Sequence, residues 1–145
     1  MQLPRYSYKV NKNFLDYEFT SEGPKGTIKK IIRFTAIGRN LFNVGFGDLE
    51  ELTGNINDIV VTNNGDRRMV IVTVASAVYD FMLKYPDAVV VAKGSTVART
   101  RLYRIGITNN LEEINRNFYV FGLTNKTWET FITGKDYDAF LIRKE

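Results

Sequence analysis

Residues 66–92 read DRRMVIVTVASAVYDFMLKYPDAVVVA, a long periodic apolar segment followed by a short apolar run, and this combination sets the class of fold. Apolar side chains recur at helical spacing as far as Met82, and Tyr85-Pro86 ends the pattern because the residue before a proline disfavours helix. We therefore expect a helix of about 16 to 19 residues, with Asp66 as its cap or first-turn carboxylate. Residues 88–92 then predict a short strand inside a sheet.

Strands joined by turns are expected before this helix. Residues 21–26, SEGPKG, have the Gly and Pro of a hairpin connection, and Gly38-Arg39-Asn40 is a second turn signal. The segments between these turns are rich in aromatic and β-branched residues, which favours an antiparallel sheet. The four expected strands are 14–20, 27–36, 41–46 and 58–62.

After the central strand, the sequence predicts two shorter helices and a return to strands. The helices are a basic one over 95–105, ended by Gly106, and a brief one over 110–116. The three expected C-terminal strands are 118–123, 128–132 and 138–143, joined by turns at 124–126 and 134–136. The predicted fold is therefore α+β: one domain over 1–145, with the helices packed on one face of an antiparallel-rich sheet.

The positive charge of the chain is concentrated after the central strand. From Ala88 to Leu111 there is no acidic residue, and the cations of this stretch sum to +4, which equals the formal net charge of the whole chain. The stretch also runs from a strand through Gly94-Ser95-Thr96 into a helix, and N–H groups exposed at such a junction favour anions. A positive field and a place for a phosphate therefore coincide.

We predict a phosphate site at this junction. An anion at the start of the helix would meet backbone N–H groups and the hydroxyls of Ser95 and Thr96, and Arg99 would add a guanidinium from the same edge of the helix. Another face carries Ala98, Leu102 and Ile105, and we expect that face to be buried. The candidate ligand-binding residues are Lys93, Ser95, Thr96, Arg99, Arg101 and Arg104.

A purely structural interpretation of the same residues stays open. Ser95 or Thr96 would then be an ordinary helix N-cap, the arginines a solvated face, and Arg99 the partner of a distant carboxylate. The Gly-Ser-Thr run lacks the Gly-Lys-Ser/Thr spacing of a phosphate-binding loop, and no segment matches Gly-x-Gly-x-x-Gly.

Other polar and aromatic residues give weaker signals. Aromatic side chains accompany basic ones along the strands, as single-stranded nucleic acid binding requires, although most strand aromatics face a core or a cross-strand neighbour. Lys29, Lys30 and Arg33 are expected to solubilise an edge or open face of the sheet. The carboxylates and amides from Asp48 to Asp58 fail the spacing of a calcium loop, so we expect a solvated acidic loop and no metal site.

Composition excludes several classes of function. The chain has 145 residues, 44% of them hydrophobic, as in a folded domain, and it contains no cysteine and no histidine. These absences remove disulfides, Ser-His and Cys-His catalysis and imidazole-bound metals, and no cofactor is expected. The amino terminus lacks the apolar core of a signal peptide and no run of about 18 apolar residues occurs, so we expect a cytoplasmic protein with no membrane span.

Three segments in order carry a resemblance to a known family: SEGPKG at 21–26, TNNGD at 62–66 and GSTVARTRLYR at 94–104. With them, the chain resembles a small family of bacterial proteins of unknown function over nearly all of its length. That family has no established activity, so the resemblance implies no functional residues. The inferred order of strands and a long helix also looks like the Whirly single-stranded DNA-binding proteins, although this chain lacks their Lys-Gly-Lys-Ala signature.

Three functions are compatible with these observations. The leading hypothesis is a protein that binds single-stranded nucleic acid or a phosphate-bearing ligand through its basic helix. The alternative is a protein-interaction module or homodimeric regulator with no catalytic activity, for which exposed aromatic strand edges would matter. An enzyme acting on a phosphorylated substrate ranks third, because no set of nucleophile, base and orienting group can be assembled from the spacing.

Overall fold

One mixed sheet organises the part of the chain that the computed structural model describes, residues 4–57 and 64–145. The strands follow the spatial order β1-β2-β3-β4-β6-β9-β7-β8, with β5 paired to β4. Only the β4/β6 pair is parallel among the described strand pairs. The expected α+β class and antiparallel-rich sheet are therefore confirmed.

The bounds of the elements agree closely with the expected segments. The first half contains β1 (Lys9–Val10), β2 (Asp16–Gly23), β3 (Gly26–Gly38), β4 (Leu41–Glu50) and β5 (Asn55–Asn57). The middle contains α1 (Arg67–Lys84), β6 (Val89–Ala92), α2 (Val97–Asn109) and α3 (Leu111–Asn115). The C-terminal strands are β7 (Phe118–Thr124), β8 (Thr127–Thr130) and β9 (Ala139–Lys144). The strand expected over 58–62 lies outside the described residues, and the short strands β1 and β5 were not expected.

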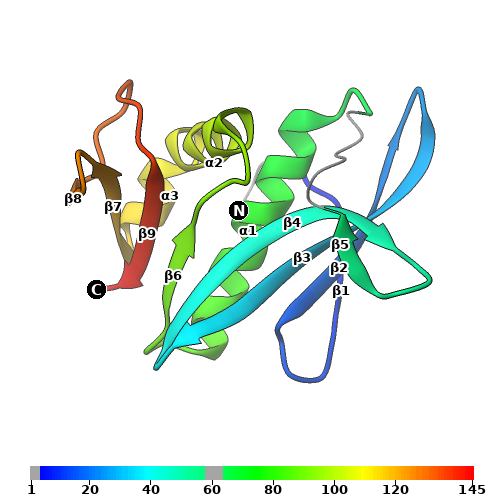
Figure 1. Cartoon of the computed structure of the whole chain (residues 1–145), viewed down its shortest axis with the longest axis horizontal. Helices are drawn as coiled ribbons and strands as arrows, with labels where there is room; N and C mark the ends of the chain where they lie inside the picture. The colour runs from blue at the N-terminus through cyan, green and yellow to red at the C-terminus, as the bar shows by residue number, and fades with distance from the viewer. Residues whose placement is uncertain (1–3, 58–63) are drawn as a thin grey trace.

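Helix α1 forms the centre of the core. It passes behind β4 in Figure 1 and spans 18 residues, as its periodicity predicted. Phe81 is fully buried, and its ring stacks on that of Phe34 with centroids 4.0 Å apart and the planes 3° from parallel. Burial of side chains of this size stabilises a fold by about 1.5–3 kcal/mol each. Packing against the sheet face that it covers thus stabilises α1.

Asp66 occupies the N-cap position of α1, but its side chain makes no capping hydrogen bond. Its Oδ2 accepts hydrogen bonds from the hydroxyl of Tyr6, at 2.5 Å, and from that of Ser21 on β2. Asp66 is therefore the cap residue by position, as expected, but its carboxylate does not bind the first N–H groups of the helix. The carboxylate instead joins the start of the helix to the N-terminal segment and to the β2–β3 hairpin.

The basic helix α2 differs from expectation in its end and in its buried face. It continues through Gly106 to Asn109, because Gly106 lies where α2 crosses α1: a Cβ there would lie 2.6 Å from Cγ1 of Ile71. Gly106 therefore allows close helix packing and does not end the helix. Ala98 and Ile105, expected to be buried, are exposed, and Leu102 is only partly buried. The buried residues of α2 are Arg99, Thr100, Tyr103, Gly106 and Ile107.

Lys30 also contradicts the prediction of a solvated face. Strand β3 lies between β2 and β4, and Lys30 points to the core side, where it is 1% exposed. Its Nζ lies 2.6 Å from Oδ1 of Asp48, its register partner on β4. A buried lysine requires such a paired carboxylate, because an isolated charge in the core is costly to desolvate. Lys29 and Arg33 are more accessible and pair with Glu51 and Asp16.

Candidate anion-binding pocket

The segment that follows β6 opens into a pocket at one edge of the sheet. Strand β9 lies between β6 and β7 and is antiparallel to both, so β6 and β7 end at the same edge. Figure 1 shows the start of α2 and the loop before β9 together at this end of the molecule. The topology therefore brings the 93–96 segment, which follows β6, and the turn that follows β7 to the same edge of the sheet.

This pocket is open and has a volume of about 540 Å³. That volume lies within the range of small-molecule sites, about 300–1,000 Å³. Its wall combines cations and hydroxyl groups from the segment that follows β6, from α2 and from the β7–β8 turn. The cations are Lys93, Arg101, Arg104 and Lys126, and the carboxylates are Asp136 and Asp138 from the loop before β9. Four positive and two negative side chains leave the pocket with an excess of positive charge.

Hydrogen bonds within the first turn of α2 shape the floor of the pocket. Thr96 is the N-cap, in an extended conformation, and its Oγ1 accepts a hydrogen bond from the backbone N–H of Arg99 at 3.1 Å. Thr100 Oγ1 accepts from the N–H of Gly94 at 3.1 Å and donates to the carbonyl of Thr96. A side chain at Gly94 would collide, because its Cβ would lie 2.5 Å from the backbone nitrogen of Thr100. Thr96 and Val97, which begin α2 and line the pocket, therefore place the positive end of this helix at the pocket, where the N–H of Arg99 is already bound by the cap.

Arg104 is the cation most firmly held in the wall. Its side chain is 24% exposed, and Nη1 lies 3.2 Å from Oδ1 of Asp136, whose side chain is 87% exposed. Its Nε is buried and has no hydrogen-bond partner among the described residues. Because this Nε is closed to solvent, an anion would meet the guanidinium through its two Nη atoms, of which Nη1 is paired with the exposed Asp136.

Five of the six predicted ligand-binding residues line this one pocket: Lys93, Ser95, Thr96, Arg101 and Arg104. Arg99 does not. It is 5% exposed, its Nη1 donates to the backbone carbonyl of Phe46, and its guanidinium carbon lies 4.3 Å from the centroid of the Phe46 ring. Thr96 is also the N-cap of the structural interpretation, so capping and pocket lining coexist at this residue.

Sequence reasoning missed Lys126, Asp136 and Asp138. Lys126 and Asp136 lie in segments that the sequence marks as turns, and Asp138 begins an expected strand. The insertion of β9 between β6 and β7 brings all three beside α2. A different strand order would have placed the same turns elsewhere. The sequence therefore showed these charged residues, but their position beside α2 depends on the order of the strands.

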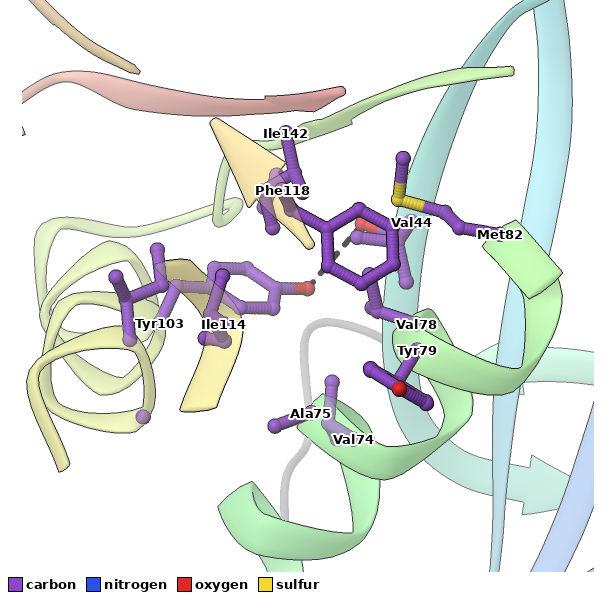
Figure 2. A pocket seen from close by; sticks show the side chains of 13 residues that line it. Val44, Val74, Ala75, Val78, Tyr79, Met82, Tyr103, Ile114, Phe118 and Ile142 are labelled. Carbon is purple, nitrogen blue, oxygen red and sulfur yellow. Dashed lines mark hydrogen bonds between the residues drawn. The ribbon is translucent and has the colours of Figure 1, made fainter. Parts of the chain in front are cut away.

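A second cavity lies in the core between the helices and the sheet, and Figure 2 shows its side chains. It is lined almost entirely by apolar groups and has a volume of only about 40 Å³. The hydroxyl of Tyr103 donates to the backbone carbonyl of Val44 at 3.3 Å beside it. Because organic ligands require several hundred Å³, this cavity is a packing void of the core.

Neither a metal site nor a membrane-spanning helix is found in the described part of the chain. Across residues 4–57 and 64–145, no three acidic side chains gather in a way that could hold a metal ion. No helix within these ranges is long and apolar enough to cross a membrane.

The fold and the pocket define an α+β protein with a cationic pocket at the carboxyl ends of β6 and β7. By sequence, the chain belongs to a family of unknown function, DUF6934, whose family model matches residues 2–145. The predicted family resemblance is thereby confirmed, while the bacterial origin and the likeness to Whirly proteins stay predictions. No curated protein and no solved structure matches the chain.

Proposed function

We propose that the pocket at the start of α2 binds a phosphate group of an anionic ligand. The proposal is supported by the excess of cations over carboxylates in its wall and by the positive end of α2 at its floor. Its open volume of about 540 Å³ accommodates a phosphate together with part of the group attached to it.

The observation that carries the proposal is the state of Arg104. Its side chain is partly exposed in the pocket wall, and among the described residues its Nη1 is paired with Asp136, whose own side chain lies mostly in solvent. A phosphate presents several acceptor oxygens and matches the planar guanidinium with two parallel hydrogen bonds. Arg104 would therefore gain a bidentate partner on binding.

The test is isothermal titration calorimetry of the full chain with inorganic pyrophosphate, at low and at physiological salt. Arg104→Ala should weaken binding about 10- to 100-fold, the size of a lost hydrogen bond to a charged group. Arg116→Ala is the matched control: it removes the same charge from the C-cap of α3, where Arg116 is 69% exposed and its Nη2 lies 3.9 Å from Oε1 of Glu112. Equal affinity of Arg104→Ala and the unaltered protein would reject the proposal.

Asp136→Asn supplies the opposite test. Asp136 competes with the ligand for Nη1 of Arg104, so removing its charge should raise pyrophosphate affinity up to about fivefold, since exposed ion pairs contribute about 0–1 kcal/mol. A structural ion pair would give another result: lower thermal stability and unchanged affinity. That result would contradict the proposed role of Arg104.

A further inference from the structure

The sheet face opposite the core carries exposed aromatic side chains on β7 and β8. Side chains alternate along a strand, and Phe118 and Val120 of β7 are buried in the core. Tyr119, Phe121 and Leu123 therefore point to the other face. Tyr119 is 43% exposed, while Phe121 and Leu123 are partly buried.

Strand β8 adds the chain's single tryptophan to this face. Trp128 is the register partner of Leu123, and cross-strand partners point to the same side of a sheet. Trp128 is 41% exposed. Three aromatic rings thus lie on the outer face of two neighbouring strands.

A cation is stacked among these rings. Arg143 of β9 is the register partner of Tyr119, and its guanidinium carbon lies 4.7 Å from the centroid of the Tyr119 ring and 5.6 Å from that of Phe121. The acidic residue of β8, Glu129, is bound by Lys135 and Tyr137 and, as the partner of Gly122, points to the opposite face. The aromatic face is therefore positively charged.

This face is continuous with the cationic pocket. Leu123, which lies beside Trp128, lines the pocket, and so does Lys126 from the turn between β7 and β8. From Leu123 to Tyr119 the strand runs four residues, about 13 Å at the rise of a β-strand. Aromatic rings thus extend from the edge of the pocket across the sheet.

We infer that the outer face of β7–β9 is a base-stacking platform and that the ligand is single-stranded nucleic acid. This inference rests on the proposed phosphate pocket: a backbone phosphate would lie against Arg104 while bases stack on Trp128 and Tyr119. Sheet faces with exposed aromatic side chains bind two or three unpaired bases in this manner, and stacking tolerates any base sequence. Arg143 is placed to contact a base or a phosphate on the same face.

Charge favours nucleic acid over a second copy of the chain as the occupant. In a two-fold dimer the same patch faces itself, which would bring the cations Arg143 and Lys126 of two copies close together. A polyanion neutralises these charges instead. The positive charge of this face is thus complementary to a nucleic acid strand.

The test compares oligo(dT) with an abasic oligomer of the same length and charge, using fluorescence anisotropy of labelled oligomers and the intrinsic fluorescence of Trp128. Oligo(dT) should bind more tightly than the abasic oligomer and quench the tryptophan. Trp128→Ala and Tyr119→Ala should each weaken oligo(dT) binding about 5- to 140-fold and leave the abasic oligomer unaffected. Trp128→Phe should retain most of the affinity, because it keeps a ring for stacking.

Two controls separate the platform from the pocket. Leu83→Ala removes an exposed hydrophobic side chain from α1, where Leu83 is 58% exposed, and should change neither affinity. Arg104→Ala should weaken both oligomers, because both have phosphates. Each variant is compared by circular dichroism and thermal unfolding, so that a loss of affinity is not a loss of fold.

The outcomes are distinct. Equal affinity for the two oligomers with unchanged fluorescence overturns the platform and leaves the phosphate pocket in place. Failure of both oligomers and of pyrophosphate to bind overturns both. A dimer in light scattering that Trp128→Ala dissociates would show that a second copy occupies this face, and it would also overturn the platform.

Discussion

Replacing Arg99 by alanine should destabilise the fold and leave anion binding intact. The hydrogen bond from its guanidinium to the Phe46 carbonyl contributes about 1.5–3 kcal/mol, as bonds from charged groups do. Its position 4.3 Å from the centroid of the Phe46 ring adds about 0.5–2 kcal/mol. Removing a buried charge relieves part of its desolvation cost, so we expect a net loss of about 2 kcal/mol. For a chain of this size, that lowers Tm by about 4–8 °C.

Urea unfolding followed by circular dichroism measures the stability change, and calorimetry with pyrophosphate measures binding. Arg101→Ala is the contrasting variant: Arg101 is exposed and lines the pocket, so its loss should weaken pyrophosphate binding and change stability by no more than about 0.5 kcal/mol. The reasoning is refuted if Arg99→Ala abolishes binding at an unchanged free energy of unfolding. Arg99 would then reach the pocket in solution, as the sequence first suggested.

Three further predictions concern stability. Gly122→Ala should lower the free energy of unfolding by about 1–3 kcal/mol through overpacking, since the new Cβ would lie 2.3 Å from Cδ1 of Tyr137. In the control Gly45→Ala the new Cβ meets no atom within 4 Å, so thermal unfolding should be nearly unchanged. Thr96→Ala should lower the unfolding free energy by about 1 kcal/mol through loss of the N-cap bond, measured in urea; an unchanged midpoint would mean that this cap is not formed. Burial raises the pKa of Tyr8 and of Tyr17 above the ordinary value of 10, so the folded state favours the neutral phenols. The free energy of unfolding should therefore be constant up to about pH 10 and fall above it. A rise in the free energy of unfolding from about pH 8 to about pH 11 would contradict this.

Local periodicity was sufficient to predict the longer elements, because each has a strong pattern of its own, whereas the short strands β1 and β5 were not predicted. The apolar spacing of residues 70–82 and the proline at 86 define α1, and alternation defines the C-terminal strands. Gly106 shows the limit of such reasoning. A glycine near the end of a helical pattern favours a C-cap, but here the approach of α1 at Ile71 explains it, and no local pattern reports that approach.

The error over Arg99 has the same origin. At 100° per residue, the pattern of α2 does not decide which of two faces is buried. Because arginine is normally exposed, the sequence favours the face without Arg99 as the buried one. The side that packs inward is decided by Phe46 of β4, far away in the sequence, which offers both an aromatic ring and a carbonyl to the guanidinium. With Arg99 inside, Arg101 and Arg104 turn toward the sheet edge.

The position of β9 explains how both carboxylates and cations come to line the pocket. Because β9 is inserted between β6 and β7, the loop that precedes it carries Asp136 and Asp138 to a wall that the rest of the chain makes cationic. These carboxylates lower the field without neutralising it, and Asp136 orients Arg104 at 3.2 Å while it remains mostly in solvent. An exposed partner of this kind contributes little to stability and is readily exchanged for a stronger acceptor. In the proposed function, the guanidinium of Arg104 is therefore held in place before a ligand arrives, at the edge from which the aromatic face of β7 and β8 extends.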